Sequence, residues 1–254
     1  MKTQPAILVT TAIDFNFKKS KKNIFLLGEW CKINKKYLEK DLTHKVQKCH
    51  WTDFNKLKKD SKYIAYGSKI VSNIDKSVLE KYQLQEQKYH MLIARIEPEN
   101  NVETILDGVC LSSDKTSFLV IGDYNNNNFG KRIKEKYKNF QNIIFLGSIY
   151  NNEELNSLRY YCNLYFHGHS VGGTNPSLLE AMGSSNLIVA HNNIFNKAVL
   201  KEDGFYFYTP EDVSFYLKNK NKNKENLKIE NNKLKIKNEY DINKINNSYF
   251  TYFH

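Results

Sequence analysis

The stretch NLYFHGHSVGGTNPSLLEAMGSSNLIVAHN, residues 163–192, holds the pattern that decides the fold. Its two ends, NLYFHGHS and NLIVAHN, are short apolar runs that predict buried strands. The segment between them predicts a helix, because Pro176 suits a first turn, where its missing N–H costs nothing, and Asn175 or Thr174 would cap it. A strand, a helix and a second strand in direct succession predict a parallel βαβ unit.

The same alternation continues on both sides of this unit. Further strands are predicted at residues 89–96, 117–124, 142–149 and 204–209. Helices are predicted at residues 99–112, 129–140 and 151–162, the last with Asn152 as its N-cap. We therefore predict an α/β fold, a Rossmann-like parallel sheet with helices on both faces. Apolar runs at 6–11 and 23–28 predict a partial α/β segment before it.

Ligands of such sheets bind at the carboxyl ends of the strands, where several polar groups of this chain fall. Gly172 and Gly173 allow a close backbone approach, and the helix that begins at Pro176 attracts phosphate through its free amides. Arg95 can hold a diphosphate with two hydrogen bonds, and the Glu180 carboxylate can accept two ribose hydroxyls. These groups together match a nucleotide sugar, which has a ribose, a diphosphate and a hexose.

The 254 residues, 41% of them hydrophobic, allow one sizeable domain or two small ones. The net charge is +11, and residues 218–254 supply nine lysines against four acids, hence +5 of it. The positive charge does not gather on a recognition element, so we expect no nucleic-acid partner. We predict that residues 211–254 form an Asn/Lys-rich low-complexity tail, mainly solvated. A weak attraction of this tail to the inner face of an anionic membrane stays open.

Cysteine usage and the N-terminus indicate a cytoplasmic protein. The four cysteines lie far apart, without a CxxC pair, as is typical of reduced, mostly buried thiols: Cys31, Cys49, Cys110 and Cys162. His44 and His50 lie near two of them, but the spacing matches no zinc pattern, and we expect no metal. No apolar stretch approaches the ~20 residues that span a bilayer.

Two stretches carry a resemblance to a known family. YHMLIARIEPENNVETILDGV (89–109) and YFHGHSVGGTNPSLLEAM (165–182) resemble the C-terminal, donor-binding domain of family 4 (group 1) glycosyltransferases, which have a two-Rossmann architecture. The similarity runs from about residue 62 to residue 208. It is greatest to a rhamnosyltransferase-like branch, whose members carry a similar RIEPENN and HGHSVGGTNPSLLEA. The resemblance implies transfer of a hexosyl unit from a nucleoside-diphosphate sugar to a saccharide or lipid-linked acceptor, without metal or cofactor.

The resemblance also implies roles for individual residues. Arg95 matches the arginine that holds the donor diphosphate, and Asn100 stands where the family often has a lysine. Glu180 matches the second of two glutamates eight residues apart, the one that binds the ribose, whereas the first would fall at Gly172. Two further residues, with Gly172 and Gly173, match the loop that faces the diphosphate and sugar: Thr174 and Asn175.

The loop after the strand at 142–149 matches the one that borders the base, with Ser148, Ile149 and Tyr150. His167 and His169 lie beside the glycine loop, and for both a role in the site and a structural role stay open. The resemblance identifies no catalytic residue.

The first sixty residues depart from this family. ILVTTAIDF, NIFLLGEWCKI and KCHWTDFNKLKKD resemble the N-terminal portion of transferases from surface-polysaccharide loci. We therefore predict three parts: a partial segment (1–60), a donor-binding domain (61–210) and the tail (211–254). Because a full acceptor-binding domain is longer, a catalytically silent nucleotide-sugar binding remnant or a partner subunit remains the alternative, and a generic nucleotide-binding domain is a third.

Overall fold

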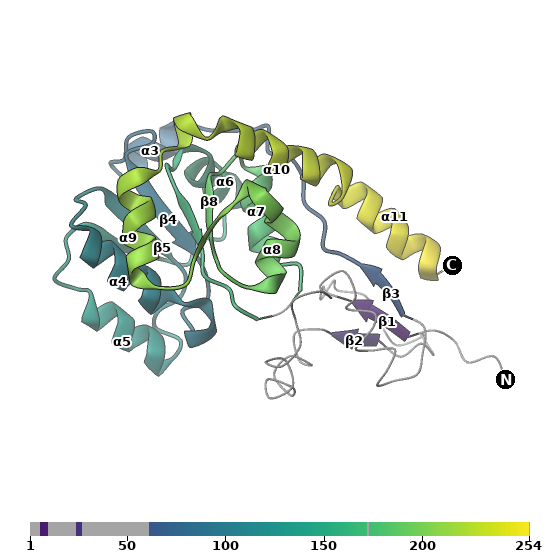
Figure 1. Cartoon of the computed structure of the whole chain (residues 1–254), viewed down its shortest axis with the longest axis horizontal. Helices are drawn as coiled ribbons and strands as arrows, with labels where there is room; N and C mark the ends of the chain where they lie inside the picture. The colour runs from purple at the N-terminus through teal and green to yellow at the C-terminus, as the bar shows by residue number, and fades with distance from the viewer. Residues whose placement is uncertain (1–5, 10–23, 27–60, 172, 254) are drawn as a thin grey trace.

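The structure is a computed structural model that describes residues 6–9, 24–26, 61–171 and 173–253 (Figure 1). Within these residues the first sheet contains β1 (Ala6–Val9), β2 (Ile24–Leu26) and β3 (Ser61–Ile64). The strands are parallel and lie in the order β2-β1-β3. The strands predicted at 6–11 and 23–28 are confirmed as far as the description reaches. The predictions for Cys31, His44, Cys49 and His50 lie outside the described residues.

The second sheet is parallel and, in the described chain, has six strands in the order β6-β5-β4-β7-β8-β9. They are β4 (Tyr89–Ile93), β5 (Ser117–Ile121), β6 (Ile143–Gly147), β7 (Tyr165–His167), β8 (Ile188–His191) and β9 (Phe205–Phe207). The chain runs outward from β4 to β6 and then returns to β7 on the other side of β4. Ligands of such sheets bind at this reversal of strand order, between the carboxyl ends of β4 and β7.

Helices cover both faces of the second sheet, as the sequence predicted (Figure 1). They are α3 (Ser77–Lys81), α4 (Val102–Ser112), α5 (Asn128–Lys136), α6 (Asn152–Tyr161), α7 (Pro176–Gly183), α8 (Ile194–Leu200) and α9 (Pro210–Asn219). Met91 belongs to a core cluster with α6 and α7, whereas its neighbour Leu92 belongs to a second cluster with α4, α5 and α9. Successive side chains of a strand point to opposite faces, so β4 contributes to both cores.

Asparagine caps begin several helices at the carboxyl edge of the sheet. Asn175 caps α7, and its Oδ1 accepts a hydrogen bond from the backbone N of Ser177 at 2.9 Å, as predicted. The cap of α6 is Asn151, one residue before the predicted Asn152, because Asn151 Oδ1 accepts from the backbone N of Glu153 and Glu154. These caps satisfy amides that would otherwise lack a partner and fix where each helix starts.

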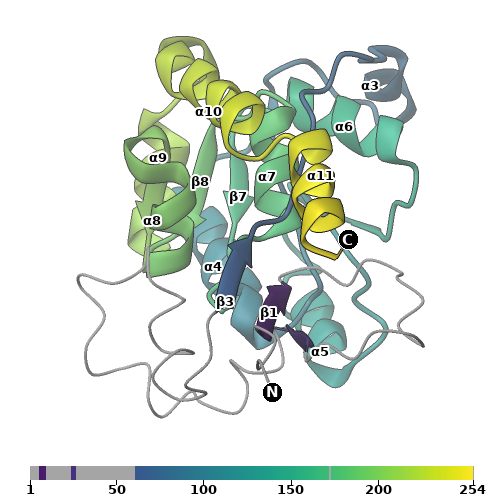
Figure 2. The ribbon, with the colours of Figure 1, turned by 90° about the vertical axis from the view of Figure 1, so that its right-hand side faces the viewer.

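The Asn/Lys-rich end of the chain is helical and runs back toward the first sheet as α10 (Asn226–Asn238) and α11 (Ile242–Phe253), as Figures 1 and 2 show. Ile236 of α10 is buried in the core, and the Tyr249 hydroxyl donates to the Ile64 carbonyl at 3.3 Å. The division of the chain at residues 60 and 210 stays a prediction. Among the described helices, none combines the length and apolar character needed to cross a membrane.

Candidate functional site

A pocket of about 350 Å³ lies at the carboxyl edge of the second sheet, where the loops after β4, β5 and β6 meet. Its polar lining includes Arg95, Asp123, Asn127, Ser148 and Tyr150. Arg95 and residues 148–150, which lie far apart in the sequence, therefore share one pocket. Asp123 and Asn127 are polar residues of the pocket to which the sequence assigned no role.

Arg95 presents its guanidinium to solvent at the mouth of this pocket. Its side chain is 69% exposed, and Nη1 lies 3.5 Å from Oε2 of Glu97. An ion pair at this exposure contributes little stability, about 0–1 kcal/mol. The charge of Arg95 is therefore available to an anion that enters the pocket.

The loops after β4 and β7 are tied together by buried amides. Nδ2 of Asn100 donates to the Arg95 carbonyl at 2.8 Å, and its Oδ1 lies 2.6 Å from Nδ1 of His169. Since Oδ1 is the acceptor, the proton of His169 sits on Nδ1. Nδ2 of Asn101 donates to the Gly168 carbonyl at 2.7 Å. Asn100 thus has a structural role, and its predicted contact with a diphosphate stays a prediction.

Two glycines let the loops after β7 and β5 approach the loop after β4. A Cβ atom on Gly168 would lie 1.9 Å from the Asn100 carbonyl oxygen, and one on Gly122 would lie 1.9 Å from the Ala94 carbonyl oxygen. No real contact is this short, so only glycine fits at either position. Of the two glycines that the sequence analysis selected, Gly172 lies outside the described residues, and Gly173 is half-buried just before the helix.

The two histidines beside the glycine loop are held neutral. His167 is buried, and in the described structure its Nε2 has no hydrogen-bond partner. Burial lowers the His167 pKa to about 3. The pKa of His169 is lowered first by burial and then by the positive charge of Arg95. The Asn100–His169 hydrogen bond joins the loop that carries Arg95 to the loop that leads to α7.

Helix α7 begins where the loop after β7 ends. Thr174 is buried directly before the cap residue Asn175, and the Ser177 hydroxyl lies 2.8 Å from that of Tyr165. The first amides of a helix carry partial positive charge and bind anions. Residues 173–175 and the helix start lie at the strand reversal, beside the loop that carries Arg95.

Glu180 is held by a buried cation that the sequence analysis missed. Nη2 of Arg159 donates to Oε2 of Glu180 at 2.6 Å, and Nη1 donates to Oδ1 of Asn156 at 3.1 Å. The Arg159 side chain is 4% exposed and that of Glu180 is 47% exposed. The Glu180 carboxylate is thus held by Arg159 on its buried side and is accessible to solvent on its other side. The spacing could have shown that Arg159 is buried, because Arg159 follows Leu155 by four residues on the buried face of α6.

Titratable side chains of the described residues form no candidate metal centre, since no group of three or more His, Cys, Asp or Glu lies together there. Cys162 is buried, which raises its thiol pKa to about 12, and Cys110 is half-buried. The prediction of a buried thiol is confirmed for Cys162.

The described fold is a doubly wound α/β domain with a pocket at the carboxyl edge of its sheet. The chain belongs to the glycosyl transferases group 1, whose family model matches residues 76–233, more than half of the chain. A second family model, the LIC12162 family transferase, matches residues 6–89. No curated protein matches the chain.

Solved structures share the fold at low sequence identity. Anabaena HepE, determined in complex with UDP and glucose, superposes with a TM-score of 0.64 at 14% identity, over 75% of this chain and 56% of its own. A glycosyltransferase from Rickettsia africae superposes with a TM-score of 0.66 at 15% identity, over 80% of this chain and 60% of its own. The C-terminal domain of LpcC from Francisella tularensis superposes with a TM-score of 0.54 at 17% identity, over 70% of this chain and 97% of its own. The chain thus spans 56–60% of the first two proteins.

Proposed function

We propose that this chain binds a nucleoside-diphosphate sugar at the carboxyl edge of the second sheet and transfers its hexosyl unit to a saccharide or lipid-linked saccharide. The observation that carries the proposal is the shared pocket of Arg95 and residues 148–150, beside the strand reversal where α7 begins. The structure of HepE with UDP and glucose supports a donor of this class. The resemblance to the rhamnosyltransferase-like branch supports a rhamnosyl unit and a part in surface-polysaccharide synthesis.

The proposed mechanism is stabilisation of the leaving diphosphate by preorganised positive groups. Arg95 would hold one phosphate, and the backbone N–H groups of residues 173–175 would bind the other. Glu180, oriented by Arg159, would accept the ribose hydroxyls, and residues 148–150 would border the base. Because these groups are fixed before the bond breaks, they stabilise the developing charge without reorganisation. The chemistry at the anomeric carbon needs no metal in this scheme.

Titration of the full chain with UDP, dTDP and GDP tests the donor site. We expect at least one of them to bind, and Arg95→Ala to weaken that binding by about 1.5–3 kcal/mol, as for the loss of a charged hydrogen bond. Arg132→Ala is the matched control, because Arg132 pairs with Glu103 outside the pocket. If a folded chain binds none of the three, or Arg95→Ala binds unchanged, the proposal fails.

A second candidate is a nucleotide-sugar binding remnant or partner subunit without turnover of its own. The departure of the first sixty residues from the group 1 family favours it, because the group 1 family model matches residues 76–233 and a different family model matches residues 6–89. Incubation with radiolabelled sugar nucleotides and a lipid-linked acceptor separates the two candidates. Turnover supports the transferase, whereas binding without turnover supports the remnant.

The surplus of positive charge in residues 218–254 supports a weak peripheral contact with an anionic membrane as part of this proposal. Flotation of the chain with phosphatidylglycerol vesicles at low and high salt tests it. Binding that is absent at both salt concentrations removes the membrane from the scheme.

A further inference from the structure

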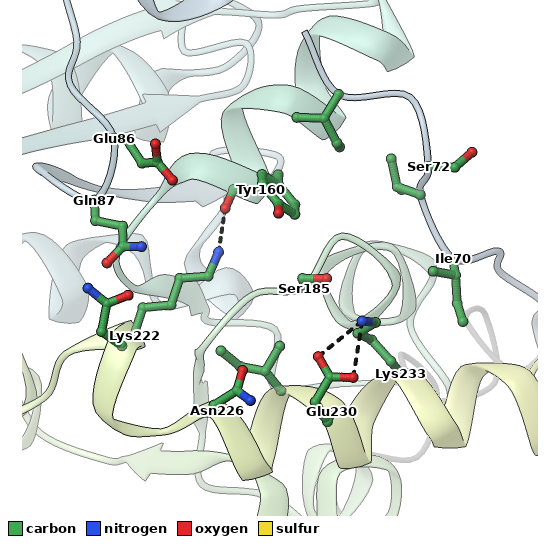
Figure 3. A pocket seen from close by; sticks show the side chains of 14 residues that line it. Ile70, Ser72, Glu86, Gln87, Tyr160, Ser185, Lys222, Asn226, Glu230 and Lys233 are labelled. Carbon is green, nitrogen blue, oxygen red and sulfur yellow. Dashed lines mark hydrogen bonds and ion pairs between the residues drawn. The ribbon is translucent and has the colours of Figure 1, made fainter. Parts of the chain in front are cut away.

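A second pocket, of about 490 Å³, lies at the amino edge of the second sheet (Figure 3). Gln87 lies shortly before β4, Tyr160 lies at the end of α6 before β7, and Ser185 lies between α7 and β8. The remaining walls come from α10 and from the segment after β3, which contributes Ile70 and other residues. Parallel strands place their two ends at opposite edges, so a ligand here would lie across the sheet from Arg95.

The described residues that line this pocket balance their charges. The lining contains two lysines, Lys222 and Lys233, and two glutamates, Glu86 and Glu230. Lys233 pairs with Glu230 at 3.0 Å, and the Lys222 ammonium donates to the Tyr160 carbonyl. Burial also lowers the pKa of Lys222. Because both lysines are engaged by groups of the protein, this pocket is poorly suited to a phosphate or a nucleotide.

Hydrogen-bonding groups nevertheless surround the pocket. Oε1 of Gln87 is buried and, within the described chain, has no hydrogen-bond partner. The Gln87 backbone is fixed by a bond from its N–H to the Tyr161 carbonyl at 2.8 Å. A buried acceptor without a partner costs free energy unless a ligand or water donates to it. Figure 3 shows the side chains of Ser72, Ser185 and Asn226 around the same space, where they offer further hydroxyl and amide groups.

An aromatic ring completes the lining. Tyr160 is 37% exposed, and its ring centroid lies 5.1 Å from that of Tyr161. The Lys222 ammonium lies 5.1 Å from the same centroid, so a ligand has the rest of the ring to contact. The negative face of such a ring attracts weakly positive C–H groups. The amides and hydroxyls of the pocket suit a ligand with many hydroxyls, and the ring suits one with apolar C–H faces. The balanced charges of the lining suit a ligand without charge. This is the chemistry of a neutral saccharide.

We propose that the amino-edge pocket is a binding site for a neutral saccharide, separate from the nucleotide pocket. The proposal does not rest on the donor function, because it uses none of the carboxyl-edge residues. The Gln87 side-chain amide hydrogen-bonds to a sugar hydroxyl, and the Tyr160 ring packs against a C–H face. The amides and hydroxyls of α10 and of the α7–β8 turn fix the orientation of the sugar.

Saturation-transfer-difference NMR on the full chain tests this site with three probes: maltotriose, cellotriose and methyl α-rhamnoside. At least one should receive saturation, and saturating UDP should leave that signal unchanged. Gln87→Leu should weaken binding about three- to tenfold and Tyr160→Ala about tenfold, as expected for one hydrogen bond and one aromatic contact. Tyr208→Ala, an exposed tyrosine outside this pocket, is the matched control and should change nothing.

Three results would overturn the proposal: no transfer to any probe from a folded chain, displacement of the probe by UDP or by inorganic pyrophosphate, or unchanged binding in Gln87→Leu. Displacement by UDP would place the sugar in the nucleotide pocket, and displacement by pyrophosphate would make the site an anion site. Thermal unfolding followed by circular dichroism shows whether Tyr160→Ala folds. If Tyr160→Ala does not fold, Gln87→Leu decides the question alone. Gln87→Leu should fold, because the Gln87 Oε1 atom has no hydrogen-bond partner in the described chain to lose.

Discussion

The two edges of the second sheet have opposite chemistry although the same strands lead to both. At the carboxyl edge, an exposed arginine, neutral histidines and a helix start lie together, and two glycines bring their loops into contact. At the amino edge, helix ends and the segment after β3 enclose a charge-balanced pocket. The difference follows from the parallel arrangement, which places the loops that follow strands on one edge of the sheet and the loops that precede them on the other.

Among the substitutions considered, Gly168→Ala at the carboxyl edge should cause the largest loss of stability. The new Cβ would meet the Asn100 carbonyl oxygen at 1.9 Å, so one of the two loops has to move. We expect a loss of about 3 kcal/mol in the free energy of unfolding by urea. Gly147→Ala is the control, because its φ is +74° but nothing lies within 4 Å of the added atom, and about 1 kcal/mol is expected. Equal losses would contradict the close approach of the loops.

Arg159→Leu should have the next largest effect. It removes the buried partner of Glu180, and the loss of a charged hydrogen bond costs about 1.5–3 kcal/mol of stability. Nucleoside-diphosphate affinity should fall about tenfold, because the carboxylate loses its orientation. Arg132→Leu breaks a pair of exposed charges and should cost only about 0.5 kcal/mol. Unchanged nucleotide affinity in Arg159→Leu would exclude Glu180 from the donor site.

Acid should weaken the carboxyl edge through His167. In the unfolded chain this histidine takes up a proton near its ordinary pKa of 6.5, whereas in the folded chain the pKa is about 3. Stability that is present above pH 6.5 is therefore lost as the pH falls, by about 2 kcal/mol at pH 5. Urea unfolding at pH 7 and pH 5 measures the loss, and His167→Leu should reduce it. The same loss in His167→Leu would mean that other groups cause it.

Tyr150→Ala should have the smallest effect on stability. The residue lines the nucleotide pocket and is 89% exposed, so we expect a change below about 0.5 kcal/mol in unfolding. Nucleotide binding should weaken about threefold through the lost contact with the base. Tyr208→Ala, 67% exposed and outside that pocket, should leave binding unchanged. Equal binding by both variants would remove Tyr150 from the base site.

The sequence predicted the second sheet well because its signals are local. Apolar runs between polar loops marked each strand, and the Asn175-Pro176 step marked the start of α7. The edge at which Arg95 and residues 148–150 meet followed from the parallel arrangement alone.

Other features depend on contacts between distant residues and could not be read from local patterns. The need for glycine at Gly168 comes from a carbonyl sixty-eight positions earlier in the chain, at Asn100. The pairing of Arg159 with Glu180 joins two helices, and the amino-edge pocket joins α6, α10 and the segment after β3. The burial of Ile236 and Tyr249 in an Asn/Lys-rich segment likewise became visible only in the folded chain.

Hydrogen–deuterium exchange, with and without whichever of UDP, dTDP and GDP binds most tightly, tests the central claim most directly. If the diphosphate lies between Arg95 and the start of α7, amides of residues 93–97, 148–150 and 173–178 should become protected together. Amides of residues 70–74 and 222–233, at the amino edge, should exchange at an unchanged rate. Protection that omits residues 173–178, or that falls on the amino edge instead, would contradict the account.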